Sequence, residues 1–305
     1  FCNDFFMKNI FIFILSFILV LIFAFTFIKV KENYNINFKY SNNSYNNKNN
    51  IKNNTIEKDL DDIFHSADIN APNIAKPILN KVNEYSNYIS IIIDDSGNTL
   101  DNLNRYFDLA NEYNITFAVL PDSSHSIDFS YEAYLRNVNV ILHIPMEGSR
   151  SFGEHTIIKR GMNKDEIYRL LDYSFSKVPY AIGMNNHTGS LASSDENIVS
   201  YMLDYAKNND KYFIDSYTSS ESLIYDMALE YGVKTARRSV FLDNERDYSS
   251  IMKQWRKLID ISKEYGIAIG IGHYQSEETL KILEYNMPIL KDEGITAVNI
   301  TEVLY

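Results

Sequence analysis

Two adjacent carboxylates end an apolar stretch of the chain in the segment YISIIIDDSGNTL, residues 88–100. Like charges at this spacing repel, and each makes the other harder to ionise. A bound cation would offset that cost. Because neighbouring strand residues point to opposite faces, Asp94 and Asp95 are expected to do different jobs. One would bind a metal ion, and the other would hold an attacking water as a general base.

Further polar side chains stand where other short apolar runs end, and three of the six histidines are among them. These rim residues are His143, Asn185, Asn186, His187, Asp215 and His273. The carboxyl ends of parallel strands form one rim, and active sites of α/β proteins lie there. Imidazole and carboxylate are good ligands for a zinc-like divalent ion, and an open coordination position can hold an activated water. The sequence therefore predicts a divalent metal site, with Zn²⁺ as the expected ion.

Two charged residues close to these runs have alternative interpretations. Glu147 lies four residues after His143, so the two side chains meet if the chain coils after the strand. Otherwise Glu147 is a solvated loop residue. Arg238, in the segment RRSVFLDN, either binds a carboxylate of a substrate or partner or pairs internally with Asp215 or Asp243. We slightly favour the internal pair.

The elements that position these residues follow from a regular alternation of segments after Tyr88. The short apolar runs are SIIID, ITFAVLP, VNVILHIP, AIGMNNH, YFIDS, VKTARRSVFL, IAIGIGH and ITAVNI. Amphipathic stretches such as LDNLNRYFDLANEY and YSSIMKQWRKLIDISKEYG lie between most of them. This alternation predicts a parallel sheet covered by helices, either closed into a barrel or open and doubly wound. No GxGxxG or GxxxxGK[ST] motif follows a run, which argues against dinucleotide and P-loop sites.

The N-terminal part of the chain predicts a membrane anchor. After the short segment 1–9, residues 10–28 contain no charge, Gly or Pro, and this length can cross a bilayer as a helix. No small-x-small cleavage site follows, so we expect a retained signal anchor. Long domains translocate largely regardless of flanking charges, so we place the domain outside the cytoplasm, in the periplasm or on the cell surface.

Composition divides the remainder of the chain and excludes some partners. Residues 29–55 are rich in asparagine and predict a flexible linker, residues 56–86 have weak helical patterns of edge helices, and residues 87–305 form the domain. The formal net charge of −11 argues against nucleic acid as a partner. Cys2 is the only cysteine, which excludes a disulfide framework and a cysteine-based zinc site.

Several of these segments resemble those of a known family. IIIDDSG, ITFAVLP, VILHIPMEG, AIGMNNHTGS, FIDSYTS, RRSVFLDN and IAIGIGH occur in the order and spacing of the divergent polysaccharide deacetylase family. The resemblance runs from Tyr88 to the C-terminus, and its most specific parts are NNHxGS and VFLDN. It implies a distorted (β/α) barrel and a metal-dependent deacetylase.

The resemblance also implies roles for individual residues. Asp94 would act as the base, and Asp95 and His143 would bind the metal. The position four residues after this histidine usually holds a second histidine, but here it is Glu147. Either Glu147 itself or His187 would then complete the metal site, and both are candidate ligands.

The remaining roles concern the proton donor and its surroundings. His273 would protonate the leaving amine, and Asp215 resembles an acidic residue that orients catalytic groups. Asn186 belongs to the NNHxGS segment, and Arg238 and Asp243 match the motif RRSVFLDN of this branch.

Two functions follow as alternatives. The first is a metal-dependent hydrolase that acts on N-acetyl groups of an envelope carbohydrate. The second is a catalytically inactive, membrane-tethered binding or scaffolding module that keeps the deacetylase fold, as the altered ligand motif would allow. A glycoside hydrolase is a weaker alternative, because its paired carboxylates sit on separate elements several ångströms apart.

Overall fold

The computed structural model describes residues 87–149 and 156–305 of the chain. The expected anchor, linker and edge helices, residues 10–28, 29–55 and 56–86, lie outside these residues, as does segment 1–9. Among the helices of the described part, none is both long and apolar enough to cross a membrane.

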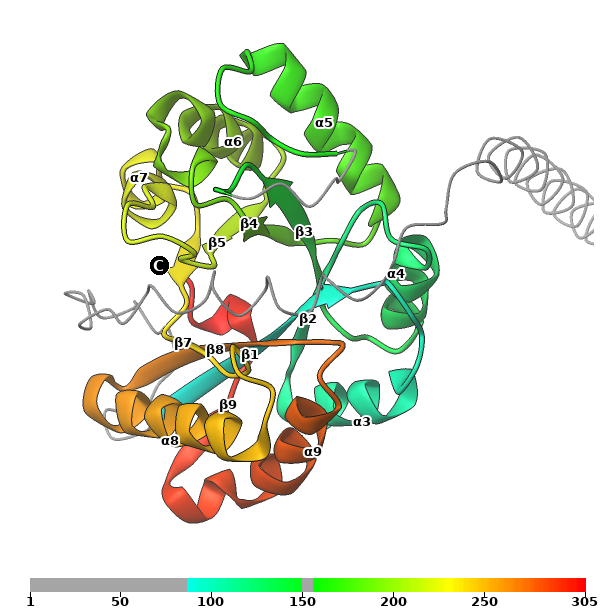
Figure 1. Ribbon diagram of the computed structural model, residues 1–305, viewed down its shortest axis with the longest axis vertical. Helices are drawn as coiled ribbons and strands as arrows, with labels where there is room; N and C mark the ends of the chain where they lie inside the picture. Colours follow the sequence, from blue (N-terminus) through cyan, green and yellow to red (C-terminus); the bar gives the residue numbers. More distant parts are fainter. Residues whose placement is uncertain (1–86, 150–155) are drawn as a thin grey trace, which may run out of the picture. The chain divides into compact units, whose positions relative to one another are not determined.

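The described strands form one sheet in which every strand pair is parallel (Figure 1). Their bounds are β1 Asn87–Ser96, β2 Thr116–Val119, β3 Val140–Met146, β4 Gly183–Thr188, β5 Tyr212–Asp215, β6 Thr235–Arg237, β7 Val240–Phe241, β8 Ile267–His273 and β9 Ile295–Ala297. The order across the sheet is β6-β5-β4-β3-β2-β1-β8-β7. β9 lies outside this order and pairs with the first residues of β1. The predicted parallel sheet is confirmed.

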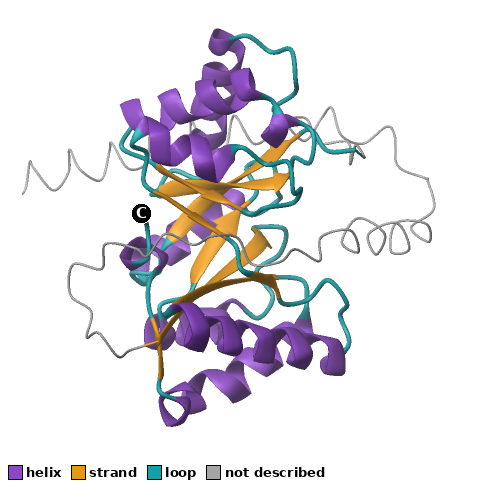
Figure 2. Cartoon of the chain, turned by 90° about the vertical axis from the view of Figure 1, so that its left-hand side faces the viewer, coloured by secondary structure: helices purple, strands orange, loops and turns teal. Residues whose placement is uncertain are grey.

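The α-helices lie around the outer face of the curled sheet (Figures 1 and 2), and they contribute to a hydrophobic cluster there. The α-helices are α3 Leu103–Tyr113, α4 Ser126–Leu135, α5 Lys164–Lys177, α6 Glu196–Asn208, α7 Ile224–Tyr231, α8 Tyr248–Tyr265 and α9 Glu277–Asn286. The 3₁₀ helices are η1 Ala192–Ser194, η2 Met287–Glu293 and η3 Ile300–Glu302. Ordinary local signals set the helix ends. Asn163 and Glu166 form a capping box at the start of α5, and α8 ends at Gly266 with φ 84°, directly before β8.

One stretch of chain joins the two edges of the sheet. β6 pairs with β5, β7 pairs with β8, and only Arg238 and Ser239 separate β6 from β7. The Arg238 N–H donates to the Asp215 carbonyl at 3.0 Å, and the Ser239 N–H donates to the Ile269 carbonyl at 2.8 Å. The sheet is therefore curled, and it fits the distorted (β/α) barrel better than the open, doubly wound alternative. The run VKTARRSVFL forms two short strands instead of the single one that we expected.

Two separate hydrophobic clusters show which side chains face the inside of the curl. The larger cluster lies between sheet and helices and takes Ile91 and Ile93 from β1. The smaller one consists mainly of side chains on the opposite, inner face of the strands and includes Ile92, Ile141 and Ile271. Since strand side chains alternate between faces, the residue two positions further along shares the face of these isoleucines. Asp94, His143 and His273 occupy those positions, so the inner apolar cluster continues into a group of polar side chains.

Candidate active site

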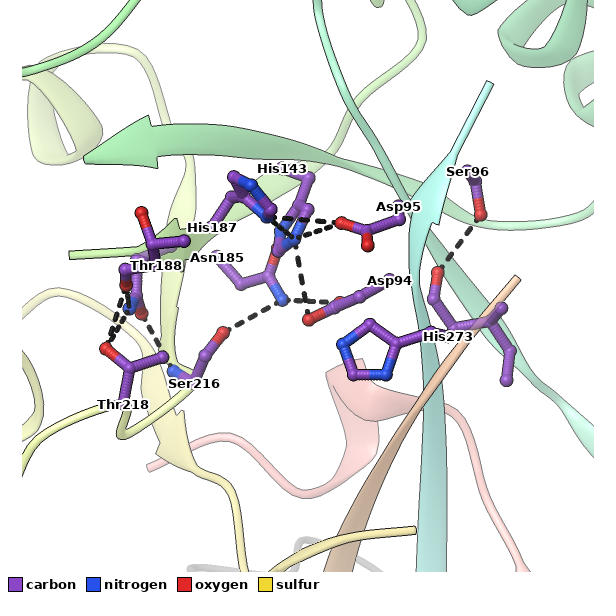
Figure 3. A network of polar contacts seen from close by, with 12 residues as sticks. Asp94, Asp95, Ser96, His143, Asn185, His187, Thr188, Ser216, Thr218 and His273 are labelled. Carbon is purple, nitrogen blue, oxygen red and sulfur yellow. Dashed lines mark hydrogen bonds and ion pairs between the residues drawn. The ribbon is translucent and has the colours of Figure 1, made fainter. Parts of the chain in front are cut away.

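Polar side chains from four strands meet at the carboxyl end of the sheet (Figure 3). Asp94 and Asp95 come from β1, His143 from β3, Asn185 and His187 from β4, and His273 from β8. β3 and β4 are neighbours in the sheet with His143 opposite Asn185, and β1 and β8 are neighbours with Asp94 opposite His273. Parallel pairing in register therefore brings together residues that lie far apart in the sequence.

Three ligand atoms form a compact triangle. Oδ1 of Asp95 lies 3.3 Å from Nε2 of His143 and 3.1 Å from Nδ1 of His187, and the two nitrogens are 3.1 Å apart. All are within the spacing of a metal-ligand group. In a tetrahedral zinc site with bonds of about 2.0 Å, ligand atoms are about 3.3 Å apart. The triangle therefore has the size that such an ion requires.

The hydrogen bonding of Asp95 gives an independent test of this fit. Its Oδ1 is buried, and no hydrogen bond from the described residues satisfies it. An unsatisfied buried carboxylate oxygen is costly, and a cation on it would remove that cost. Burial by itself raises the pKa of Asp95, but the neighbouring His187 and His143 outweigh it and hold that pKa well below its usual value. The carboxylate is therefore ionised, as a metal ligand must be, and the donor set fits a divalent ion.

The backbone of Asp95 explains how both aspartates reach one point. Side chains of neighbouring strand residues should face opposite sides, yet Asp95 lies 3.3 Å and Asp94 3.6 Å from Nε2 of His143. Asp95 has φ 56°, in the left-handed region that non-glycine residues rarely adopt. The strand makes a local turn there without ending, since its register with β2 shifts between Ile93 and Ser96, and Gly97 follows with φ 96°. The expectation of opposite sides is wrong because of this turn, and such strain is frequent at functional sites.

Asp94 has a different environment from its neighbour. Its Oδ1 accepts a hydrogen bond of 2.8 Å from Nδ2 of Asn185. Burial raises the pKa of Asp94 above its usual value, although His143 and His273 oppose the rise. A carboxylate with a raised pKa beside a metal-ligand group has the character of a general base.

Asn185 connects this carboxylate to the histidine ligand. Its Nδ2 donates to Asp94 and to Oγ of Ser216 at 3.1 Å, so its Oδ1 is the atom 2.7 Å from Nδ1 of His143. An amide oxygen only accepts, so Nδ1 of His143 carries the proton and Nε2 presents its lone pair to Asp95. The sequence indicates a rim position for Asn185 but no role. Its position two residues before His187, on the same face of β4, was the available signal.

His273 is held by a second carboxylate. Oδ1 of Asp243 lies 2.7 Å from Nδ1 of His273, and its Oδ2 accepts from the His273 N–H at 2.8 Å and from Oγ1 of Thr279 at 2.6 Å. Burial alone would lower the pKa of His273, but Asp243 more than offsets this and raises it to about 9. The imidazole is therefore cationic at neutral pH.

The structure does not bring Asp215 to this group. Its Oδ1 accepts from the Tyr217 N–H at 2.8 Å and from Oγ of Ser222 at 3.1 Å, and its Oδ2 lies 3.8 Å from Nε of Arg237. Asp215 follows the inward-facing Ile214 by one residue, so it faces the other side of the sheet. Asp243, not Asp215, contacts the histidine expected to act as the acid.

Glu147 is also separate from the ligand triangle. β3 remains extended through Met146, so the chain does not coil and four residues span about 13 Å. Glu147 instead pairs with Arg160, with Nε and Oε2 3.3 Å apart, and this arginine lowers the pKa of Glu147. The alternative of a loop residue outside the site fits this placement.

Asn186 and Arg238 have contacts with the backbone at the rim. Oδ1 of Asn186 accepts from the Ser216 N–H at 2.9 Å, and its Nδ2 donates to the Thr188 carbonyl at 2.7 Å. Asn186 therefore ties the end of β4 to the loop after β5. Arg238 forms no ion pair with Asp215 or Asp243 among the described residues, contrary to the pairing that we favoured.

Comparisons with known proteins agree with this architecture. The family model described as divergent polysaccharide deacetylase matches residues 91–304. An uncharacterized protein of Escherichia coli (strain K12), YibQ, is 33% identical over 204 residues, which are 66% of this chain and 63% of that protein. An uncharacterized protein of Haemophilus influenzae Rd is 27% identical over 206 residues, 67% of this chain and 72% of that protein. The match thus spans less than two thirds of the length of YibQ.

A solved structure shows a similar fold. The crystal structure of the uncharacterized protein ATU2773 from Agrobacterium tumefaciens C58 aligns with a TM-score of 0.67 at 16% identity. The alignment covers 72% of this chain and 90% of that one. At this identity the similarity concerns the fold alone.

The triangle predicts which substitutions remove a metal ion. The wild-type protein should bind one Zn²⁺ per chain, and His143→Ala or His187→Ala should lose stoichiometric zinc because each removes one of three ligands. Glu147→Gln should keep it and is the matched control. Elemental analysis after dialysis, with a chelator competition titration, measures this. Loss of zinc in Glu147→Gln, or its retention in His187→Ala, would contradict the ligand set.

The orienting contact of Asn185 predicts a smaller effect. Asn185→Leu should weaken zinc binding about 10- to 100-fold, as is usual when the partner of a ligating histidine is lost. Ser216→Ala removes the other acceptor of the Asn185 amide but not the contact with His143, so its affinity should stay near that of the wild type. Equal zinc affinity in the two variants would show that Asn185 does not orient the ligand.

Proposed function

The chain belongs to the divergent polysaccharide deacetylase family, and from that premise we propose that it is a metal-dependent hydrolase of N-acetyl groups on an envelope carbohydrate. One observation carries this proposal above the others. The unsatisfied Oδ1 of Asp95 faces two imidazole nitrogens at metal-ligand spacing, with a base and an acid on neighbouring strands.

Asp95, His143 and His187 would hold the metal ion. When bound, a divalent ion supplies a polarised water and stabilises negative charge that develops on a carbonyl oxygen. Nε2 of His143 would be available to the ion, because Nδ1 donates its hydrogen bond to Oδ1 of Asn185. Asp95 contributes the negative charge that a neutral pair of imidazoles lacks.

Asp94 is positioned to accept a proton from the attacking water. The amide of Asn185 fixes one of its oxygens, and the raised pKa makes the carboxylate a better proton acceptor than an exposed aspartate. As the oxygen of water bonds to the acetyl carbon, this proton passes to Asp94. The same amide thus holds both the base and a metal ligand.

His273 is positioned to donate a proton to the departing amine. Asp243 holds its Nδ1, which leaves the Nε2 proton as the one to be transferred, and the pKa of about 9 keeps the ring protonated at neutral pH. As the C–N bond breaks, the amine nitrogen takes the proton and the products are acetate and a free amino sugar. Asp94 and His273 lie opposite each other on the paired strands β1 and β8, so the base and the acid are neighbours at the carboxyl end of the sheet.

The altered motif at position 147 no longer favours a non-catalytic module. His187 completes a three-ligand group that does not need Glu147. The apolar segment 10–28 and the asparagine-rich linker support a membrane-tethered domain outside the cytoplasm, where an envelope glycan would be within reach.

Removing the base separates catalysis from metal binding. Asp94→Asn should keep zinc but lose at least about 100-fold in turnover, because proton transfer of this kind contributes roughly that factor or more. Acetate release from a panel of N-acetylated oligosaccharides measures the rate, and His143→Ala, which loses both zinc and activity, is the comparison. Full hydrolysis by both variants would refute the mechanism.

The acid predicts a specific pH dependence. Activity should fall as the pH rises through about 9, because His273 then loses the proton that it must donate. In Asp243→Asn burial still lowers the pKa of His273 while the opposing carboxylate is gone, so this decline should move at least one pH unit lower. The profile of kcat/KM against pH reports it. An unmoved decline with a normally folded variant would exclude His273 as the titrating acid.

A further inference from the structure

Arg238 is a rigidly held cation at the carboxyl end of the sheet. Its Nε donates to the Ser216 carbonyl at 2.7 Å, and its Nη2 donates to the Tyr217 carbonyl at 2.8 Å. The guanidinium also lies over the ring of Phe241, 3.7 Å from its centroid. Two hydrogen bonds and one stacked face fix the plane of the group. Its third nitrogen, Nη1, has no acceptor among the described residues.

The carboxylates around Arg238 bind other groups. Asp215 interacts with Arg237, and Asp243 accepts from His273 and Thr279. Asp94 is engaged by Asn185 and His143. No ion pair to Arg238 forms in the described part of the chain, so its direct contacts there are two neutral carbonyls and the Phe241 ring.

Such a cation is expensive unless an anion compensates it. Burial lowers the pKa of Arg238 from its usual value to about 10, although Asp215 and Asp94 oppose the change. The side chain still carries its charge at neutral pH. The side chain is only partly exposed, so an oxyanion bound to it would be attracted more strongly than by a fully solvated arginine.

Two contacts connect Arg238 to the catalytic group. The Phe241 ring that stacks on the guanidinium also stacks near His273, with centroids 5.9 Å apart and planes at 21°. Ser216, whose carbonyl accepts from Arg238, uses its hydroxyl to accept from Asn185. The Phe241 ring therefore contacts both Arg238 and the proposed acid, His273. Ser216 connects Arg238 to Asn185, which holds the proposed base, Asp94.

We propose that Arg238 binds an anionic group, a carboxylate or a phosphate, on the glycan that carries the acetyl group to be removed. This inference rests on the proposed function and specifies its substrate class. A guanidinium suits oxyanions because its N–H groups match their geometry. Of the two options that the sequence left open for Arg238, the structure removes the internal pair and favours the ligand.

Binding measurements test this without relying on turnover. The probes are N-acetylglucosamine, which is neutral, N-acetylmuramic acid, which adds a carboxylate, and N-acetylglucosamine 1-phosphate. Titration by NMR or calorimetry uses the zinc-loaded full chain with Asp94→Asn, so that the probes are not hydrolysed. At least one anionic probe should bind about tenfold more tightly than the neutral one, as a charge-assisted hydrogen bond would provide.

Adding Arg238→Gln to this protein should abolish the preference and leave the affinity for N-acetylglucosamine unchanged. Arg160→Gln, which removes an exposed positive charge, is the matched control and should keep the preference. Thermal unfolding checks that each variant is folded.

Three outcomes would overturn the inference: no preference for either anion, a preference that survives Arg238→Gln because the metal ion binds the anion, or an equal loss of all three probes. A failure of the proposed function would look different. The wild-type protein would then release no acetate, while the anion preference and its dependence on Arg238 remained measurable.

Discussion

A buried carboxylate oxygen that lacks a hydrogen bond is the constraint on which this site depends. Oδ1 of Asp95 lies against two imidazoles, and no hydrogen bond from residues 87–149 or 156–305 satisfies it. Such an arrangement is costly in an apolar interior. The left-handed backbone of Asp95 adds a further cost, since it brings this oxygen to the side where Asp94 already points. The fold accepts both costs, and a divalent cation is the group that would relieve them.

The surrounding network extends from this oxygen in two directions. Asn185 links His143 to Asp94. Asp243 holds His273, which lies opposite Asp94 on the neighbouring strand β8. His143, Asp94 and His273 are therefore each held by a second, buried partner. Both partners act through hydrogen bonds that fix a proton: on Nδ1 of His143 in one case, and on the His273 ring in the other.

Much of this could be predicted from the sequence, since it depends on periodicity. Apolar runs separated by amphipathic stretches indicate a parallel sheet, and polar residues at the run ends indicate its rim. Strand side chains alternate between the two faces. Once Ile214 and Phe241 are known to face inward, this alternation turns Asp215 away from the site and places Asp243 on the inner face. What could not be predicted depends on local geometry. No periodic pattern reports the turn at Asp95, and the spacing of His143 and Glu147 suits a helix turn that the extended β3 does not provide.

The two-residue connection between β6 and β7 has a consequence for how such sheets diverge. Arg238 and Ser239 bond to β5 and β8, the strands next to the two edges, so this connection is the seam of the curled sheet. Loops elsewhere on the rim can lengthen without disturbing the pairing of strands. An insertion at the seam would instead shift one edge against the other and swing the guanidinium away from its carbonyls. The curl of the sheet and the placement of the guanidinium therefore depend on the same two-residue connection.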